Sequence, residues 1–423
     1  MIHEIDEINI SKRSNKLQSL LFSFIFAMLI PTIVYSTIIN DIKVLTVLML
    51  FAYILMYVIF IYYIRFVPRI GLIFTLILIL VSLLNFIAIF FTNDIIDIQD
   101  IASMLAKYLS YFLFFLCLKN ETLHSKDFMF FLKKFIILAI IACIYNLIAN
   151  RSNFSQLVTI NSSYEVNFKS FFGNRNQFGG FLFLSNIALV YYNYVSEKLE
   201  KLFIPCSFIM ININLLLTMS RSALLATGIF YFLLLLYFVS KLSLKANIIF
   251  LINVILLFFI MRSQVVVNII NKYFIRADAG DSGRFDIWQQ GINIFLSNNI
   301  ILGSGSNAAI QIAHYQGVKV NQFHNFFIET LLDGGLVNLS LMLLTILFVL
   351  FTTLKRMPSE LKELKLIYAF SLISLTVLLT VESVNFFGLG LVDTLYGIFF
   401  IAIPMMLTNK SLNLENSSQV RNS

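Results

Sequence analysis

The sequence predicts an all-α, polytopic membrane protein with about 12 transmembrane helices and one large external loop between spans 9 and 10. Of its 423 residues, 59% are hydrophobic and 12% are charged, whereas soluble globular proteins have about 45–50% apolar and about 25% charged residues. The apolar residues also fall in blocks close to the roughly 20 residues that a helix needs to cross a bilayer. These observations exclude a soluble globular enzyme.

Charged and Asn-rich clusters separate twelve apolar blocks, and we expect each block to form one membrane-spanning helix. The blocks are 17–39, 44–64, 70–91, 101–118, 128–149, 177–195, 202–219, 222–240, 246–261, 325–354, 365–382 and 390–408. No small-residue cleavage pattern follows the first block, so it is expected to be a span and not a removed signal peptide.

Positive charges assign the two sides of the membrane. Twelve spans place both termini on one side, and the segments on that side hold 19 of the 30 Lys and Arg residues. By the positive-inside rule this is the cytoplasmic side. The expected organisation is a cytoplasmic segment 1–16, spans 1–9 over 17–261, an external loop 262–324, spans 10–12 over 325–408 and a cytoplasmic tail 409–423.

Nine of the cations expected outside gather in three segments, against this rule. Such clusters indicate an anionic ligand on the outer face. An ordinary solvated loop is the alternative explanation for the three lysines among them. The nine are Arg151, Lys169, Arg175, Arg221, Arg262, Lys272, Arg276, Arg284 and Lys319.

Arg221 lies in the hairpin Ser220-Arg221-Ser222 between two apolar blocks, with almost no loop to carry it away from the membrane surface. A guanidinium placed deeper costs about 2.5–3.5 kcal/mol in insertion. An arginine kept at this position suits forked hydrogen bonding to a phosphate, which a lysine cannot provide. Snorkelling or a structural ion pair is the alternative. Arg221 is therefore a candidate phosphate ligand, and Ser220 a candidate substrate-binding residue.

The external loop contains the only Trp of the chain and a second candidate arginine. Phe285, Trp288, Gln289 and Ile292 recur at helical spacing. Asp281 or Ser282 can cap the helix that this spacing predicts. Arg284 then lies in the first turn, where free N–H groups and the positive end of the helix dipole add to its charge. We expect an anion site here. A surface Asp–Arg pair is the alternative.

Gly303-Ser304-Gly305 is a weaker signal in the same loop. Glycine lets the backbone approach a ligand or another segment closely, and a plain reverse turn is equally compatible. The segment lacks the Gly-Lys-Ser/Thr ending of a P-loop. Gly303 and Gly305 are candidate substrate-binding residues.

His324 and Asn325 open the tenth apolar block. Asn325, Glu329 and Asp333 share one helical face, and the following Gly-Gly pair is expected to break or kink the helix, leaving a half-helix near the outer interface. Unperturbed histidine titrates near pH 6.5, so a histidine here could act as a general base. A solvated interfacial histidine is the simpler alternative.

Amide side chains open the sixth apolar block, in Asn174-Arg175-Asn176-Gln177. Amides both donate and accept hydrogen bonds, so these residues are candidate ligands of sugar hydroxyls. The run Asp94, Asp97 and Asp100 could hold a divalent cation, but its spacing favours a solvated acidic connection. No metal site and no other cofactor is expected.

Five short motifs follow one another in a specific order over about residues 173–340: Gly-Asn-x-Asn-Gln, Ser-Arg-Ser, Ser-Gly-Arg, Gly-x-Gly, and His-Asn leading into Gly-Gly. This order resembles the O-antigen ligase and polymerase superfamily, which includes Wzy-type polysaccharide polymerases and lipopolysaccharide O-antigen ligases. The resemblance implies a GT-C-like membrane glycosyltransferase. It also implies metal-independent transfer of an undecaprenyl-diphosphate-linked glycan on the outer face of the bacterial inner (cytoplasmic) membrane.

The resemblance assigns catalytic roles to three residues. Arg221 and Arg284 match arginines taken to hold the diphosphate, and His324 matches the histidine proposed as base. Asn325 stands beside it in the same motif as a candidate substrate ligand. Arg175 stands where many family members have a neutral residue, which leaves its role open. The implied mechanism is direct displacement of undecaprenyl diphosphate by a sugar hydroxyl that the histidine deprotonates.

Three functions compete at this point. A polymerase joins two lipid-linked glycans and works with a chain-length regulator, whereas a ligase transfers the glycan to a lipid A core or another acceptor. A transporter should carry charged or broken elements near the midplane of paired repeats, and here the charges lie mostly at span edges. We therefore expect a polymerase that binds membrane lipid and lipid-linked donor and acceptor glycans, not nucleic acid, with its active site facing the periplasm or cell exterior.

Overall fold

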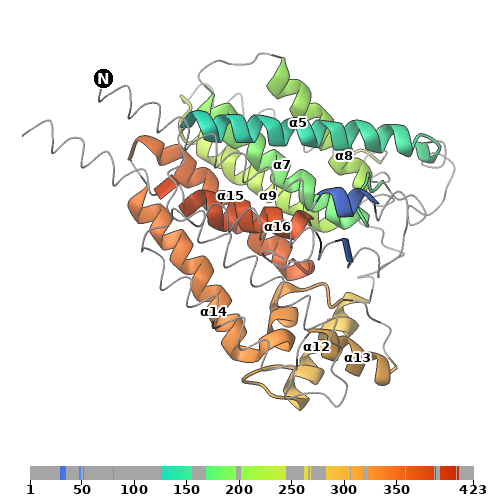
Figure 1. Ribbon diagram of the computed structural model, residues 1–423. Helices are drawn as coiled ribbons and strands as arrows, with labels where there is room; N and C mark the ends of the chain where they lie inside the picture. Colours follow the sequence, from blue (N-terminus) through green and yellow to red (C-terminus); the bar gives the residue numbers. More distant parts are fainter. Residues whose placement is uncertain are drawn as a thin grey trace, which may run out of the picture.

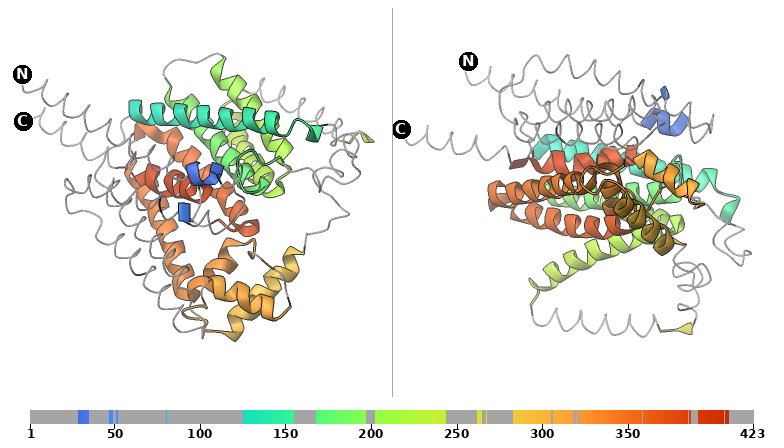
Figure 2. Two further views of the ribbon diagram at one scale, coloured as in Figure 1. Left: turned by 45° about the vertical axis from the view of Figure 1, so that its right-hand side comes forward. Right: turned by 90° about the horizontal axis from the view of Figure 1, so that it is seen from below.

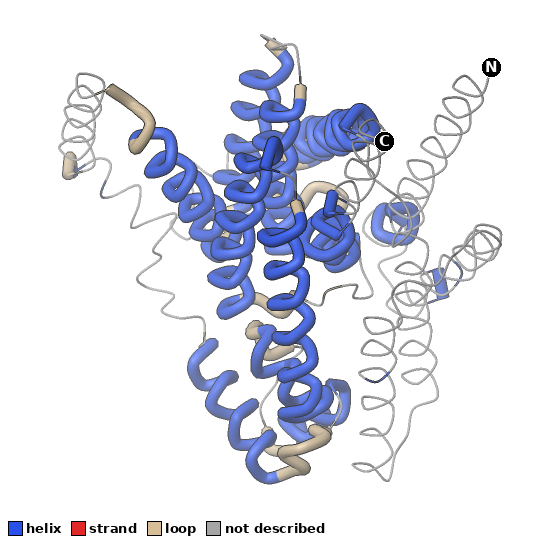
Figure 3. Tube along the Cα trace, turned by 90° about the vertical axis from the view of Figure 1, so that its left-hand side faces the viewer, coloured by secondary structure: helices blue, strands red, loops and turns tan. Residues whose placement is uncertain are grey.

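The computed structural model describes residues 125–154, 168–196, 202–243, 283–304, 306–317, 322–357, 359–384 and 391–405, together with a few shorter pieces. Every regular element in these residues is helical (Figures 1 and 3). The helices are α5 (Ser125–Ala149), α7 (Arg175–Val195), α8 (Phe203–Thr218), α9 (Arg221–Val239), α12 (Arg284–Ser297), α13 (Ser306–Tyr315), α14 (Phe326–Arg356), η4 (Ser359–Leu361), α15 (Lys362–Val381), α16 (Leu391–Gly397) and the π-helical η5 (Ile398–Ala402).

The predicted helical membrane protein is confirmed. Within the described residues, five helices are long and apolar enough to cross a membrane, namely α5, α7, α9, α14 and α15. Shorter apolar helices are α8 and the segment Leu391–Met405. These helices coincide with seven of the expected blocks. The first four blocks, apart from short pieces, and block 246–261 lie outside the described residues, so the count of 12 and the GT-C-like assignment remain predictions.

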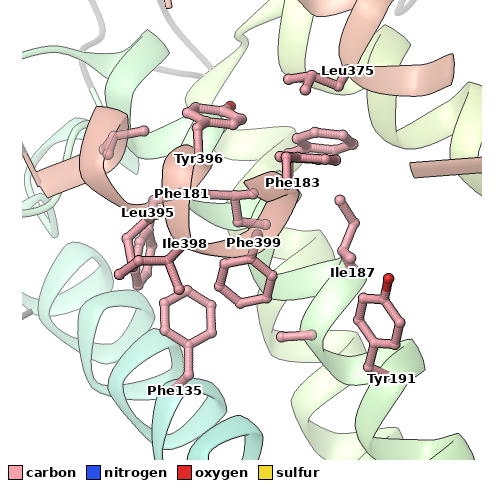
Figure 4. Packing of buried hydrophobic residues seen from close by; sticks show 14 of the residues in the cluster. Phe135, Phe181, Phe183, Ile187, Tyr191, Leu375, Leu395, Tyr396, Ile398 and Phe399 are labelled. Carbon is pink, nitrogen blue, oxygen red and sulfur yellow. The ribbon is translucent and has the colours of Figure 1, made fainter. Parts of the chain in front are cut away.

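Helix α7 is the centre of the bundle, and it packs against α5, α8, α9, α15 and α16. Aromatic rings fill the space between these helices (Figure 4). The ring of Phe135 on α5 lies 5.4 Å from that of Phe181 on α7 and 5.0 Å from that of Phe399 on η5, between ring centroids. Some of the many phenylalanines of the sequence thus pack ring against ring in this core.

Polar side chains add directional contacts between the same helices. Asn186 on α7 is fully buried, and its Oδ1 accepts hydrogen bonds from Asn212 Nδ2 at 3.0 Å and from the Tyr231 hydroxyl at 2.7 Å. Asn146 on α5 donates to Asn214 Oδ1 on α8 at 2.9 Å. Interhelical hydrogen bonds in membranes contribute about 0.6 kcal/mol each on average, so these pairs chiefly fix which helix faces meet.

Glycine allows α7 to approach the hairpin between α8 and α9. A Cβ added to Gly179 would lie 2.8 Å from Ser220 Cβ and 2.9 Å from Ala223 Cβ. The first turns of α7 are therefore held directly against Ser220, the residue that precedes α9. The glycine pair in the sixth apolar block has a packing role.

The bundle has two chemically different ends. At one end α7, α9 and α14 begin and α15 ends. The contacts of Ser222 with Glu382 and of Asn325 with Thr380 show that these helix ends lie together. We call this the Glu382 end. At the other end α7 and α9 finish and α15 begins, because Tyr194 and Lys241 both contact Glu363. We call this the Glu363 end.

A small helical module lies beside the start of α14, on the side of the bundle away from α5 (Figures 1 and 2). It consists of α12, α13 and the first two turns of α14. A separate apolar core holds these helices together. Its buried members are Ile294, Ala309, Ala313, Val320, Phe323, Ile328 and Leu332.

The predicted kink of the tenth block is confirmed at Gly334 and Gly335, where φ/ψ are −144°/21° and 67°/−162°. Backbone hydrogen bonds and close backbone contacts join the module to this kink. Ser304 N donates to Leu332 O at 2.8 Å, and Gly303 also has a positive φ of 74°. A Cβ on Gly335 would lie 2.2 Å from Ile301 O, and one on Gly303 would lie 2.6 Å from Gly335 N. Neither glycine can gain a side chain without separating the two segments.

The expected cap of α12 was wrong. The N-cap residue is Gly283, at φ 71°, which has no side chain to cap the helix; Asp281 and Ser282 lie outside the described residues. A glycine in the left-handed region lets the chain enter the helix abruptly, so the cap falls one or two residues later than predicted. Arg284 is nevertheless in the first turn, as expected.

Candidate active site

Four segments from distant parts of the sequence meet at the carboxylate of Glu382, the residue that follows α15. Glu382 is 8% exposed. Its Oε1 accepts hydrogen bonds from Arg284 Nη2 at 3.1 Å and from Ser222 Oγ at 2.8 Å. Its Oε2 lies 3.7 Å from His324 Nδ1. The structure therefore joins the Ser-Arg-Ser, Ser-Gly-Arg and His-Asn motifs through one buried carboxylate, and we call these four residues the Glu382 cluster.

Arg284 is oriented by two contacts at the end of α15. Nη2 binds Glu382, and Nη1 donates to the carbonyl oxygen of Val381. Because a guanidinium is planar, two anchored nitrogens fix its plane. The alternative of a surface pair with a neighbouring Asp does not describe this arginine, since its side chain is 22% exposed and paired with a carboxylate 98 residues away.

The Ser-Arg-Ser hairpin is built by a left-handed residue. Met219 ends α8 at φ 51° and Ser220 is the N-cap of α9, so that Arg221 is the first residue of that helix. Ser220 and Ser222 are both buried, with their hydroxyl oxygens 3.2 Å apart. Arg221 thus lies between two serines of which one, Ser222, is bonded to Glu382. This places the first predicted arginine next to the cluster in sequence and at the same end of the bundle.

His324 has a backbone conformation that is uncommon for a side-chain-bearing residue, with φ 52°. Such left-handed residues cost roughly 1–2 kcal/mol, and when they persist they mark positions that the surrounding structure determines. Gln322 Nε2 lies 2.9 Å from His324 Nδ1. The side chain of His324 is 27% exposed.

Asn325 fixes the segment that carries His324. Its Oδ1 accepts from Phe327 N at 2.9 Å and Ile328 N at 3.2 Å as the N-cap of α14, and its Nδ2 donates to Thr380 O at 2.9 Å. One amide therefore caps α14 and connects it to the end of α15. Its predicted contact with substrate remains a prediction.

A second acid, Glu329, also binds the segment that carries His324 and the segment that follows α15. Its Oε1 accepts from Phe323 N at 2.8 Å and also from the Ser383 hydroxyl. The two carboxylates thus have separate tasks: Glu329 binds the backbone before His324, and Glu382 faces its ring.

Burial raises the pKa of Glu382, but the neighbouring imidazole of His324, the charge of Arg284 and the hydrogen bond from Ser222 outweigh it, so that the net pKa lies below the ordinary value of 4.5. The carboxylate is therefore charged at neutral pH. A charged acid that is almost buried is stable only with partners of this kind.

The other predicted ligands are placed less directly. Asn174 caps α7 by accepting from Gln177 N at 2.9 Å, and Gln177 Oε1 accepts from Gly173 N at 3.2 Å, so the oxygen of each side-chain amide is used locally. Arg175 and Asn176 are half-buried in the first turn of α7. Gly303 contacts the α14 kink, which is the approach to another segment that its type allows. Gly305 lies outside the described residues.

Sequence reasoning missed Glu382, the last residue of the expected apolar block 365–382. The local signal is small: one carboxylate at the end of that block, between Val381 and Ser383. Its partners are 98 and 160 residues away. Within the described residues, no three His, Cys, Asp or Glu side chains are grouped so that they could hold a metal ion; Asp94, Asp97 and Asp100 lie outside them.

Residues 206–343 match the protein-family model described as O-antigen ligase. Over these residues the match supports the predicted resemblance to the O-antigen ligase/polymerase superfamily. The matched segment includes Arg221, Arg284 and His324, whereas Glu382 lies beyond it. No curated protein is similar enough to the chain to be reported as a relative.

The apolar helices and this match support a multi-pass membrane protein with a function broadly of the O-antigen ligase/polymerase type. Members of that family are glycosyltransferase-like and act on lipid-linked glycans. The predicted family is confirmed. Three of the five motifs that carried the resemblance meet at Glu382, through Ser222, Arg284 and His324.

Proposed function

We propose that this superfamily member is a polysaccharide polymerase of the bacterial inner (cytoplasmic) membrane. It joins undecaprenyl-diphosphate-linked oligosaccharide repeat units at the Glu382 end, which faces the periplasm or cell exterior. The observation that carries the proposal is the convergence of two arginine motifs and a histidine motif on one carboxylate. Glycan transfer requires a cation that binds the diphosphate and, beside it, a base that accepts the proton of the attacking hydroxyl.

In the proposed reaction, Arg221 and Arg284 hold the diphosphate of the donor lipid. Forked guanidinium groups match phosphate oxygens in geometry and charge. His324 takes the proton of an acceptor hydroxyl, and the oxygen attacks the anomeric carbon of the donor sugar. The carbon–oxygen bond to the diphosphate breaks, and its electron pair stays on undecaprenyl diphosphate. The arginines stabilise the charge that develops there, so no metal ion is required.

Substrate contacts beyond these three residues are also part of the proposal. Asn174, Asn176 and Gln177 lie at the start of α7, whose first turns contact Ser220. Their exposed or half-buried amides are suited to sugar hydroxyls. Ser220 can contribute through its place beside Arg221.

A ligase that transfers the glycan to a different acceptor is the second candidate, because the matched family model is described as O-antigen ligase. Both candidates use the same donor, the same arginines and the same base. They differ only in the molecule that supplies the hydroxyl.

The test is an assay of the purified protein with lipid-linked repeat units. Longer glycan on the lipid identifies a polymerase, and glycan moved to lipid A core or another acceptor identifies a ligase. Excess chelator is expected to leave the rate unchanged. Loss of the rate with chelator, and its return with magnesium or manganese, would contradict the metal-independent mechanism.

Orientation is tested separately by labelling single cysteines from the outer face of cells. We expect Tyr315→Cys in α13 to react, because this side chain is 83% exposed. Ser359→Cys, also exposed but at the Glu363 end, is expected to be protected. The opposite pattern would place the candidate site in the cytoplasm.

A further inference from the structure

Glu382 divides its two oxygens between two kinds of partner. Oε1 is shared by Arg284 of α12 and Ser222 of α9, and Oε2 faces His324 in the connection before α14. The Arg284 contact concerns the residue proposed to hold the donor, and the His324 contact concerns the residue proposed to activate the acceptor. One carboxylate therefore touches both halves of the proposed reaction.

The burial of Glu382 limits which groups can stably surround its charge. A carboxylate that is 8% exposed needs charged or hydrogen-bonding partners to be stable. Among the residues that the structure describes, Arg284 and His324 are charged or ionisable groups in contact with it, while Glu329 binds Phe323 N and Ser383. A carboxylate facing an imidazole fixes the ring and stabilises its protonated form, as in acid–histidine pairs of hydrolases.

We propose that Glu382 is a positioning residue of the transfer reaction: it orients His324 as the base and holds Arg284 in place beside it. The inference rests on the proposed function. When His324 takes the proton of the acceptor hydroxyl, the imidazolium gains the partner that lies 3.7 Å away in the resting protein. The guanidinium of Arg284 stays anchored by Val381 O and Glu382 while its outer side meets the diphosphate.

A purely structural role makes a different prediction. If Glu382 only neutralised Arg284, its replacement would lower the amount of folded protein or the affinity for the donor, and the pH dependence of the remaining activity would not move. If it also faces the working base, replacement by a neutral amide removes stabilisation of the imidazolium. The acid limb of the pH–rate profile then moves to lower pH.

The experiment compares Glu382→Gln with Glu363→Gln, the matched change at the other end of the same helix. Glu363 also binds a cation and a hydroxyl, Lys241 at 3.3 Å and Tyr194 at 2.6 Å, but at the Glu363 end. We expect Glu382→Gln to lower kcat on the order of 10²-fold, to raise KM for the lipid-linked donor because Arg284 loses one of its two anchors, and to move the acid limb to lower pH. Glu363→Gln should leave all three unchanged.

Glu382→Asp keeps the charge but withdraws the carboxylate from the ring, so it should move the acid limb in the same direction by less. This variant carries the test if Glu382→Gln is not recovered as folded protein, in which case wild-type kcat and pH profile in Glu382→Asp overturn the proposal. Wild-type kcat in Glu382→Gln, or a lowered kcat with an unmoved acid limb, also overturns it. If the wild-type protein itself transfers no glycan, the proposed function fails instead, and the role of Glu382 with it.

Discussion

Helix α15 carries a glutamate at each end, and the two ends differ in what surrounds the acid. Glu363 pairs with Lys241, and the two side chains are 30% and 51% exposed. Glu382 pairs with Arg284, with side chains 11% and 22% exposed. Both acids also accept a hydrogen bond from a hydroxyl, Tyr194 in one case and Ser222 in the other. Glu382 also has a histidine beside it, His324.

The difference shows how the same residue type acquires a different task through burial. A solvated pair is screened by water and salt and contributes little. A pair withdrawn from water interacts more strongly and costs more to leave unpaired. The Glu382 end thus concentrates charge where solvent is scarce, which is the electrostatic setting of a reaction site.

The largest effect is expected from His324→Ala, with a loss of about 10²- to 10⁴-fold in transfer rate, the usual contribution of a positioned base. Binding of undecaprenyl diphosphate should survive, because it is assigned to the arginines. His314→Gln is the matched control. The ring of this α13 histidine lies 2.6 Å from Val320 O and is not part of the Glu382 cluster. Equal rates for His324→Ala and wild type would remove the base assignment.

Arg284→Lys and Arg221→Lys should each lose roughly 10- to 100-fold in rate although the charge is kept, because an ammonium cannot make the forked contact. In Arg284→Lys the dual hold on Val381 O and Glu382 is also lost. The control is Arg356→Lys, an exposed change at the far end of α14. Near wild-type product from both site variants, at equal protein level, would mean that only their charge matters.

Acid should affect the Glu382 end through stability. The folded pKa of Glu382 is lowered below 4.5, so its stabilising charge is fully present above that value and is lost as pH falls through the folded pKa. We expect the Tm of the detergent-solubilised protein to fall less between pH 6 and 3.5 in Glu382→Gln than in the wild type. Identical Tm profiles would show that the carboxylate adds no pH-dependent stability.

The smallest effect is expected at the Glu363 end. Lys241→Ala removes an exposed ion pair, and the Tm and transfer rate should not change measurably. A clear loss of activity in this variant would end the contrast between the two ends of α15.

Local chemistry was enough to predict the helical class and to single out three candidate site residues. Arg221, Arg284 and His324 each stand out in their own stretch of sequence, as a charge at an apolar hairpin or as a polar residue opening a helix. Glu382 could not be found in this way, because only the fold brings it to Ser222, 160 residues earlier. The cap of α12 was misplaced because one glycine changed where the helix starts.

The contact between Gly303 and Gly335 has a consequence for anyone who builds chimaeras of this protein. Each glycine touches the backbone of the other's segment, and Leu336 N and Val337 N donate to Ile300 O and Ile301 O across the same junction. The loop and the kink of α14 are therefore one interlocking part. A chimaera of related enzymes should exchange residues 283–337 as a block. A transplanted loop that ended before His324 would lack the kinked segment of α14 against which it packs.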